Sequence, residues 1–245
     1  ERDAHAEGRG GSPVVVQDQG RAARRGGWPH LILGSDSRHA ARFPRPPPRD
    51  DFARRLAERP SLEDLLTADD LEKQRVAAAA RALTPAAVLL LVVNHPREPA
   101  VLFTQRTAHL ADHAGQISFP GGRAEEADAG PAHTALREAR EEVGIDPAAI
   151  EILGELPDYH TSTGYRVRPV VGWAQGPIAY APDPFEVADV FEVPLGFLLE
   201  PANHRYECAF FKGRLRHYWA MPWQGRFIWG ATAGMLVTFQ RIVGR

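Results

Sequence analysis

The chain of 245 residues is poor in cysteine, in lysine and in long apolar runs. Its one cysteine, Cys208, excludes a disulfide within the chain and with it the framework of a small secreted domain. We interpret Cys208 as a small core residue rather than a nucleophile. The longest apolar run covers only residues 86–93, whereas a helix needs about 20 apolar residues to cross a membrane. The sequence does not begin with the basic residues and apolar block of a signal peptide. It therefore favours a cytoplasmic protein with no membrane partner.

A formal net charge of −2 lacks the basic excess that nucleic-acid-binding surfaces carry. The charge is distributed unevenly, because residues 1–60 contain 12 arginines and 8 acidic residues. The rest of the chain therefore holds an acidic excess, which is compatible with a site built from metal-binding carboxylates. We expect a small-molecule substrate and no nucleic-acid partner.

Three segments differ in composition. Residues 1–50 are rich in glycine, arginine and proline without apolar periodicity, so we expect a disordered N-terminal extension. Residues 51–84 predict a helical lead-in, because Ser61 and Thr67 are each followed three residues later by an acid, as at helix N-termini. Residues 85–245 mix short strands with helices, a pattern typical of an α/β or α+β sandwich. The expected strands cover residues 86–93, 100–105, 150–156 and 167–173, followed by a strand and short helix at 191–199, a hairpin at 207–211 and 215–220, and a helix at 231–243.

Residues 132–143 predict one amphipathic helix that ends at Gly144, where glycine tolerates left-handed geometry. At roughly 100° per residue, Glu138, Glu141 and Glu142 share one face of this helix. Three like charges within one turn repel each other, and a hard cation with oxygen ligands, such as Mg²⁺, removes that penalty. The adjoining apolar stripe consists of Ala132, Leu136, Ala139 and Val143, which leaves His133 and Arg140 on the solvent side.

A solvated acidic face is the alternative explanation for such a helix, with Arg137 one turn before Glu141 as the partner of its carboxylate. The preceding segment, residues 119–122, favours a metal site instead, because it ends in two adjacent glycines. Adjacent glycines let the backbone turn sharply or approach a neighbour closely. Carbonyls of such a segment can ligate a metal, and its amides can contact phosphate.

Together these segments resemble the signature of the Nudix hydrolase family, which is a glycine, five residues, a glutamate, seven residues and then Arg-Glu-x-x-Glu-Glu. Gly122 and residues 137–145 match it. The middle departs, because Asp128 stands in the place of the glutamate and one additional residue separates it from Arg137. The resemblance implies a structural role for this acid. It also implies that residues 85–245 form a Nudix-type α/β/α sandwich with a mixed β-sheet.

The departure and the flanking motifs resemble the coenzyme A pyrophosphatase branch of this family. That branch carries Leu-Leu-Thr-x-Arg-Ser, then an arginine, then Gly-x-x-x-Phe-Pro-Gly-Gly, to which residues 102–107 and 115–122 correspond. Ala111 occupies the place of the second arginine, so Arg106 is left to take a phosphate charge by bidentate contact. Further segments that resemble the branch are residues 159–167, 186–195 and 229–235.

The resemblance implies hydrolysis of the pyrophosphate bond of coenzyme A, or of a derivative, to 3′,5′-ADP and 4′-phosphopantetheine with Mg²⁺ or Mn²⁺. Arg137 holds Glu141, and either a helix glutamate or Glu186 takes the proton of the attacking water. The expected metal ligands are Glu138, Glu141, Glu142 and the carbonyl of Gly122. The expected substrate-side residues are Arg106, Gln116, Phe119, Gly121, Gly122, Arg123 and His160.

Several alternatives stay open. Phe119 suits the core better than an adenine platform, and Gln116 and Arg123 suit loop-ordering hydrogen bonds equally well. The substrate can also be ADP-ribose, a dinucleotide or a nucleoside triphosphate, because of the missing second arginine. A non-catalytic ligand-sensing or interaction module is disfavoured, because all three helix glutamates are present. Homodimer formation is left open. Histidines interpreted as polar loop residues are His109, His113 and His160.

Overall fold

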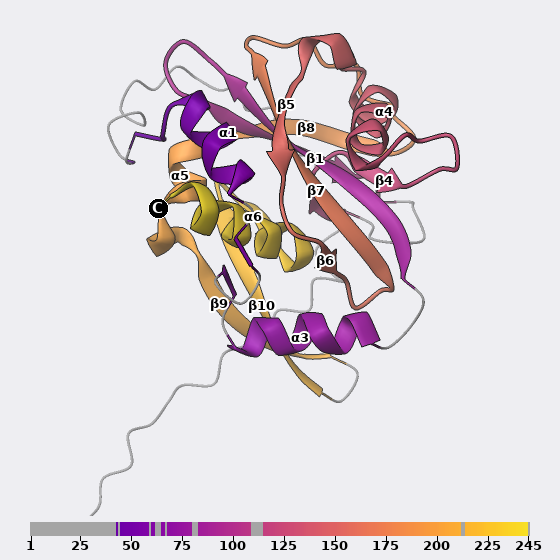
Figure 1. The fold of residues 1–245 in the computed structure, drawn as a ribbon, viewed down its shortest axis with the longest axis vertical. Coiled ribbons are helices and arrows are strands. Elements are labelled where there is room, and N and C mark those ends of the chain that lie inside the picture. The colour runs from indigo at the N-terminus through magenta and orange to yellow at the C-terminus, as the bar shows by residue number, and fades with distance from the viewer. Residues whose placement is uncertain are drawn as a thin grey trace, which may run out of the picture.

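The computed structural model describes residues 43, 45–58, 60–61, 65–66, 68–79, 83–108, 115–211 and 214–244. Within these ranges, an eight-stranded mixed sheet and a three-stranded antiparallel sheet pack with helices (Figure 1). The helices are α1 (Arg49–Ala57), α3 (Ala68–Ala79), α4 (Pro131–Val143), α5 (Leu195–Leu199) and α6 (Gly230–Val243). The strands are β1 (Thr84–Asn94), β2 (Ala100–Arg106), β3 (Ile117–Ser118), β4 (Gly121–Arg123), β5 (Glu151–Glu155), β6 (Tyr159–His160), β7 (Tyr165–Gln175), β8 (Val187–Pro194), β9 (Arg205–Phe211), β10 (Arg214–Trp223) and β11 (Arg226–Trp229).

Strand β1 occupies the centre of the large sheet. It pairs in parallel with β7 along its whole length, and antiparallel with β2 and β4. β8 and β3 pair with β2, while β5 and β6 pair with β7. Because successive side chains of a strand point to opposite faces, a continuous apolar strand can face two cores, as β1 does. Ala87, Leu89, Leu91 and Val93 belong to the core under α4, and Leu90 and Val92 to the core on the opposite face.

The two faces of the large sheet are covered by different helices. α4 lies on one face, whereas α1 and α6 lie on the other, with the small sheet of β9, β10 and β11 beyond α6 (Figure 1). Phe52 of α1 stacks on Phe239 of α6 and contacts Trp173 of β7, with ring centroids 5.9 Å apart in both pairs. The α/β/α sandwich with a mixed sheet that the sequence predicts is therefore confirmed.

Most of the expected strands and helices are present, and the differences lie at short or edge elements. β3, β4, β6 and β11 were not expected, because two to four residues are too few to show a periodicity. The interpretation of Cys208 as a core residue is wrong, because its side chain is exposed. It lies on β9, an outer strand of the three-stranded sheet. No helix in the described ranges is long and apolar enough to span a membrane.

The division at residues 50 and 84 stays an expectation. Most of residues 1–50 lie outside the described residues, as does Thr67. α1 begins at Arg49, two residues before the expected lead-in, and α3 follows it. Both helices pack on the sandwich, because Phe52 and Leu56 of α1 are buried in its core and Asp70 of α3 accepts a hydrogen bond from the indole of Trp219.

Phe52→Ala should lower the free energy of unfolding by about 3–5 kcal/mol, the usual range for truncating a buried phenylalanine. Phe52 is fully buried where α1, α6 and β7 meet, so the truncation leaves a cavity there. Urea unfolding followed by circular dichroism measures the change. The control is Val76→Ala on α3, whose side chain is 59% exposed and which should change the free energy by less than about 0.5 kcal/mol. Equal effects of both substitutions would show that α1 lies outside the cooperative core.

Candidate active site

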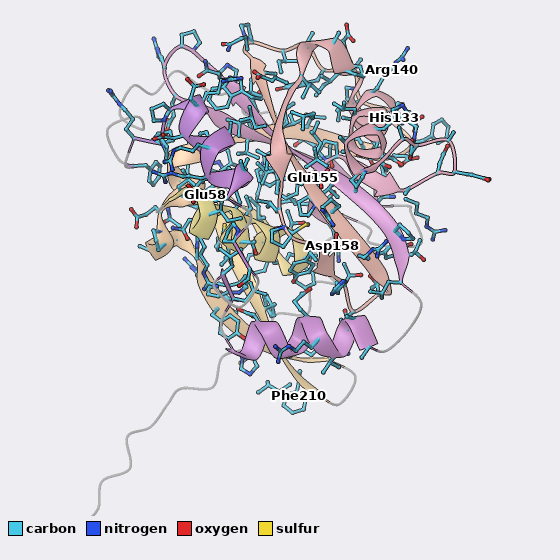
Figure 2. All side chains as sticks on the ribbon, in the orientation of Figure 1. Glu58, His133, Arg140, Glu155, Asp158 and Phe210 are labelled. Carbon is cyan, nitrogen blue, oxygen red and sulfur yellow. The ribbon has the colours of Figure 1, made fainter. Side chains whose placement is uncertain are left out.

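Helix α4 carries the acidic side chains of the candidate site. It begins with Pro131, which suits the first helical position because a backbone N–H there has no partner within the helix. Gly144 follows its last residue with a φ of 69°. The N–H of Gly144 donates to the carbonyl of Arg140 at 3.0 Å, which satisfies one carbonyl of the last turn. The expected solvent side is confirmed, because His133 and Arg140 are exposed (Figure 2). The buried stripe consists of Ala135, Ala139 and Val143, with Ala132 and Leu136 partly buried beside it.

On β4, Gly121 lies against β1 and Gly122 lies against the side chain of Glu138 on α4. The φ of Gly121 is 158°, and a Cβ atom there would overlap the carbonyl oxygen of Ala87 on β1. A Cβ atom on Gly122 would overlap the carboxylate of Glu138. Gly121 therefore requires glycine for a close approach to the backbone of β1, whereas a side chain on Gly122 would displace the carboxylate of Glu138.

Glu142 is the most deeply buried acid of the helix, with 5% of its surface exposed. The backbone N–H of Gly121 donates to its Oε2 at 3.3 Å. A guanidinium nitrogen of Arg106 lies 3.7 Å from its Oε1. Burial raises the pKa of Glu142 to about 8, with a further rise from the charge of Glu138, while Gly121 and Arg106 act in the opposite direction.

Glu138 lies one turn before Glu142, next to Gly122. Its side chain is 16% exposed, and Arg137 donates to its Oε1 at 3.0 Å. Burial raises the pKa of Glu138, and the charge of Arg137 opposes that rise. The charge of Glu186 raises the pKa of both Glu138 and Glu142. The exposed loop residue Glu186 thus lies close enough to the two helix acids for its charge to act on both.

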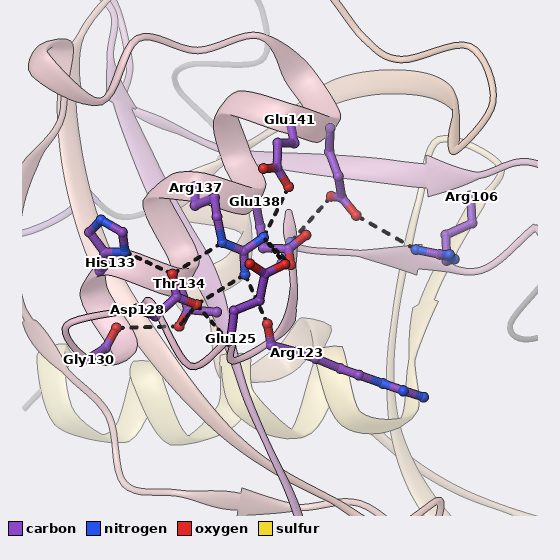
Figure 3. A network of polar contacts seen from close by, with 12 residues as sticks. Arg106, Arg123, Glu125, Asp128, Gly130, His133, Thr134, Arg137, Glu138 and Glu141 are labelled. Carbon is purple, nitrogen blue, oxygen red and sulfur yellow. Dashed lines mark hydrogen bonds and ion pairs between the residues drawn. The ribbon is translucent and has the colours of Figure 1, made fainter.

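Arg137 connects the acids of α4 to the preceding loop (Figure 3). Its guanidinium donates to both carboxylate oxygens of Asp128, at 3.2 and 3.1 Å, and to the carbonyl of Arg123 at 3.0 Å. Asp128 is 2% exposed at its side chain. It also accepts hydrogen bonds from the Thr134 hydroxyl at 2.8 Å and the Glu125 N–H at 2.9 Å. These donors, Arg137 first, hold the pKa of Asp128 far below its usual range.

Glu141 differs from its two neighbours. Its side chain is 59% exposed, and Arg137 donates to its Oε2 at 3.0 Å, as expected from the spacing. The three glutamates therefore lie on one flank of α4, but Glu141 points to Arg137 while Glu142 points inward. In the described part of the chain, no three His, Cys, Asp or Glu side chains gather as a complete metal site.

The donor set nevertheless fits a hard divalent cation. Glu138 and Glu142 are oxygen ligands, which Mg²⁺ and Mn²⁺ prefer. Burial and the negative charges of neighbouring glutamates oppose the charge on both carboxylates and raise their pKa values. A cation between them would remove that repulsion.

The expected substrate-side residues lie at different places. Phe119 is a core residue, which was the preferred of its two interpretations, because its ring is 1% exposed and stacks on Phe103 at 5.2 Å. Its inclusion among the substrate-side residues is therefore wrong. The carbonyl of Gln116 accepts from the N–H of Arg106 at 2.9 Å, so these two residues are neighbours. His160 is half-buried on β6. Ala111, His109 and His113 lie outside the described residues.

The sequence indicates no role for Tyr165. Its hydroxyl accepts hydrogen bonds from Arg123 Nε at 3.1 Å and from a terminal nitrogen of the same guanidinium at 2.7 Å. The guanidinium carbon also lies 5.5 Å from the centre of the tyrosine ring. The local sequence holds no signal for this contact, because β4 and β7 meet only through their shared neighbour β1.

Comparison with known proteins identifies the family. The NUDIX domain matches residues 83–201. A protein of Escherichia coli strain K12, named uncharacterized Nudix hydrolase NudL, is 38% identical over 176 residues, which are 72% of this chain and 91% of that protein. The chain belongs to the Nudix hydrolase family. The corresponding protein of Shigella boydii matches with the same identity and coverage.

Solved structures of Nudix proteins also resemble this Nudix hydrolase. The hydrolase RenU of M. smegmatis is 24% identical and covers 45% of this chain and 70% of its own, with a TM-score of 0.40. The NUDIX domain of NrtR from Shewanella oneidensis, solved with ADP ribose, is 25% identical and covers 55% and 87%, with a TM-score of 0.39. The family assignment makes the protein a pyrophosphohydrolase that acts on a pyrophosphate-bearing substrate.

Glu142 should make the metal-free Nudix hydrolase less stable as the pH rises. Its pKa is about 8 in the folded protein and about 4.3 in an unfolded chain. Between these values the folded state binds the additional proton, so stability falls with rising pH. Glu142→Gln removes this loss and should gain a few kcal/mol over the natural chain at about pH 8.5, but little at about pH 4.5.

Urea unfolding in EDTA at both pH values measures this difference. The matched control is Glu141→Gln, because this side chain is 59% exposed and its neutralisation should not reproduce the pH-dependent gain. A gain of equal size at both pH values would contradict the raised pKa.

Proposed function

We propose that this protein hydrolyses the pyrophosphate bond of coenzyme A, or of a derivative, to 3′,5′-ADP and 4′-phosphopantetheine. The observation that carries the proposal is the meeting of the two halves of the coenzyme A-type motif with α4. The first half ends at Arg106, whose N–H donates to the carbonyl of Gln116 in the second half at 2.9 Å. The second half ends at the glycines, where Gly121 donates to Glu142. All three segments therefore contribute to one site.

Mg²⁺ or Mn²⁺ would be held first by Glu138 and Glu142. Glu141 and the carbonyl of Gly122 would be further oxygen ligands. A divalent cation bound to a pyrophosphate neutralises charge on the phosphate oxygens and lowers the pKa of a coordinated water. Arg137 keeps Glu138 and Glu141 aligned on the flank of the helix.

The remaining side chains would bind the substrate and move the proton. Arg106 and Arg123 supply guanidinium groups for phosphate oxygens, and Tyr165 orients the second of them. Glu186 is exposed before β8, and its carbonyl accepts from the N–H of Thr107 at 2.9 Å, which fixes its loop beside β2. Either this glutamate or a helix glutamate accepts the proton of the attacking water.

Incubation with coenzyme A and Mg²⁺ or Mn²⁺, followed by mass identification of the products, tests the substrate. We expect 3′,5′-ADP and 4′-phosphopantetheine. Parallel reactions with ADP-ribose, a dinucleotide and a nucleoside triphosphate test the alternative substrates. Preferred cleavage of one of these would overturn the assignment to coenzyme A but leave the pyrophosphohydrolase chemistry intact. Acylated and oxidised coenzyme A in the same series identify the preferred form.

Glu142→Gln should lower the turnover number for coenzyme A by about 10²-fold or more, because it removes a charged group at the reacting centre. Steady-state product formation with Mg²⁺ measures the loss. The control is Glu126→Gln in the exposed loop before α4, which should keep the turnover of the natural chain. Unchanged turnover in the Glu142 variant would be incompatible with the proposed site, and absence of metal binding by the natural chain would favour a non-catalytic module.

A further inference from the structure

Arg106 is held in place by the backbone around it. The pairing of β2 with β8 shifts register between Gln105 and Arg106, where Ala188 is an additional residue on β8. The N–H of Arg106 donates to Gln116 at 2.9 Å. The next residue, Thr107, donates through its N–H to the carbonyl of Glu186 at 2.9 Å and through its hydroxyl to that of Phe185 at 2.8 Å. The backbone on both sides of Arg106 is thus fixed.

The side chain of Arg106 forms a loose ion pair with Glu142. The 3.7 Å between its guanidinium nitrogen and Oε1 of Glu142 is too long for a hydrogen bond. Arg106 is 27% exposed at its side chain, whereas Glu142 is 6% exposed. The guanidinium therefore compensates the charge of a buried carboxylate from the open side of the site without being locked to it.

Besides Arg106, a backbone group stabilises the ionised form of Glu142. Gly121 provides one backbone dipole to its Oε2, and its acidic neighbours Glu138 and Glu186 act against its ionised form. A cation held by Glu142 would lie close to the guanidinium. The two positive charges repel each other, so only one of them can be the close partner of this carboxylate at a time.

We propose that Arg106 is an exchangeable counter-ion of the ionised Glu142 carboxylate, which is released to a phosphate of the substrate when a divalent cation takes its place. This inference rests on the proposed function, because it requires Glu142 to hold the metal. Its consequence is a positive coupling between metal and substrate binding, since each favours the state in which Arg106 has left the carboxylate. Such coupling is reciprocal by thermodynamic necessity. Arg106 thus affects metal binding through Glu142, and it binds phosphate directly.

Arg106→Gln separates this role from a purely structural one. The competing charge is gone in the variant, so Mn²⁺ should bind about 5- to 10-fold more tightly, a coupling of typical size. The affinity for 3′,5′-ADP in the presence of Mn²⁺ should fall by a similar factor, because the phosphate loses its guanidinium. A variant with a damaged fold would weaken both affinities, whereas the proposal requires changes of opposite sign.

The Mn²⁺ affinity is measured by electron paramagnetic resonance on the full chain without substrate, and the 3′,5′-ADP affinity by calorimetry. Arg106→Lys keeps the charge and should return the Mn²⁺ affinity toward that of the natural chain. Arg140→Gln is the matched control, because it removes an arginine from the exposed face of α4. It should change neither affinity appreciably at physiological ionic strength, where the Debye length is about 8 Å.

Two results decide between the inference and the function on which it rests. If Glu142→Gln abolishes Mn²⁺ binding but Arg106→Gln leaves it unchanged or weaker, the counter-ion role is overturned and the proposed function stands. If Glu142→Gln leaves Mn²⁺ binding unchanged, both fail. A tighter Mn²⁺ complex together with weaker 3′,5′-ADP binding in Arg106→Gln supports the exchange.

Discussion

The close approach of the backbone at Gly121 and Gly122 to both β1 and α4 is the constraint on which the site depends. One glycine lies against the carbonyl of Ala87, and the other lies against the carboxylate of Glu138, with no space for a Cβ atom at either. This approach brings the N–H of Gly121 within reach of Glu142. A side chain on Gly121 would meet the backbone of β1, and one on Gly122 would displace the carboxylate of Glu138, so the glycines determine how closely the acids of α4 approach the sheet.

The network around Arg137 explains how the site tolerates its departure from the family signature. Asp128 is one methylene shorter than the usual glutamate, and one additional residue separates it from Arg137. The longer loop brings Asp128 to Arg137, where both carboxylate oxygens accept from the guanidinium. The same carboxylate accepts hydrogen bonds from the N–H of Glu125 and the hydroxyl of Thr134, so it orders both the loop and the start of α4. The changed acid thus retains a structural role.

Local patterns predicted those parts of the molecule that local physics determines. The apolar run at β1 indicated a strand that is buried on both faces, and the apolar periodicity of α4 indicated a helix that is buried along one stripe. The helix wheel placed three glutamates on one flank, but it could not show that Glu141 turns outward to Arg137 while Glu142 turns inward. The exposure of Cys208 depends on the outer position of β9. The contact between Arg106 and Glu142 joins segments that only the folded sheet brings together.

The burial of Glu142 joins stability to chemistry in one group. A carboxylate with 5% of its surface exposed loses hydration in its charged form, and the nearby negative charges add to that loss. The fold tolerates it because the same helix buries Ala135, Ala139 and Val143 completely, and apolar burial is the main stabilising contribution to folding. A ligand that binds only the folded state and requires the ionised carboxylate recovers the lost free energy, so its binding depends on pH and stabilises the protein. The least favourable acid of the helix is therefore the one through which a bound cation would couple proton release to folding.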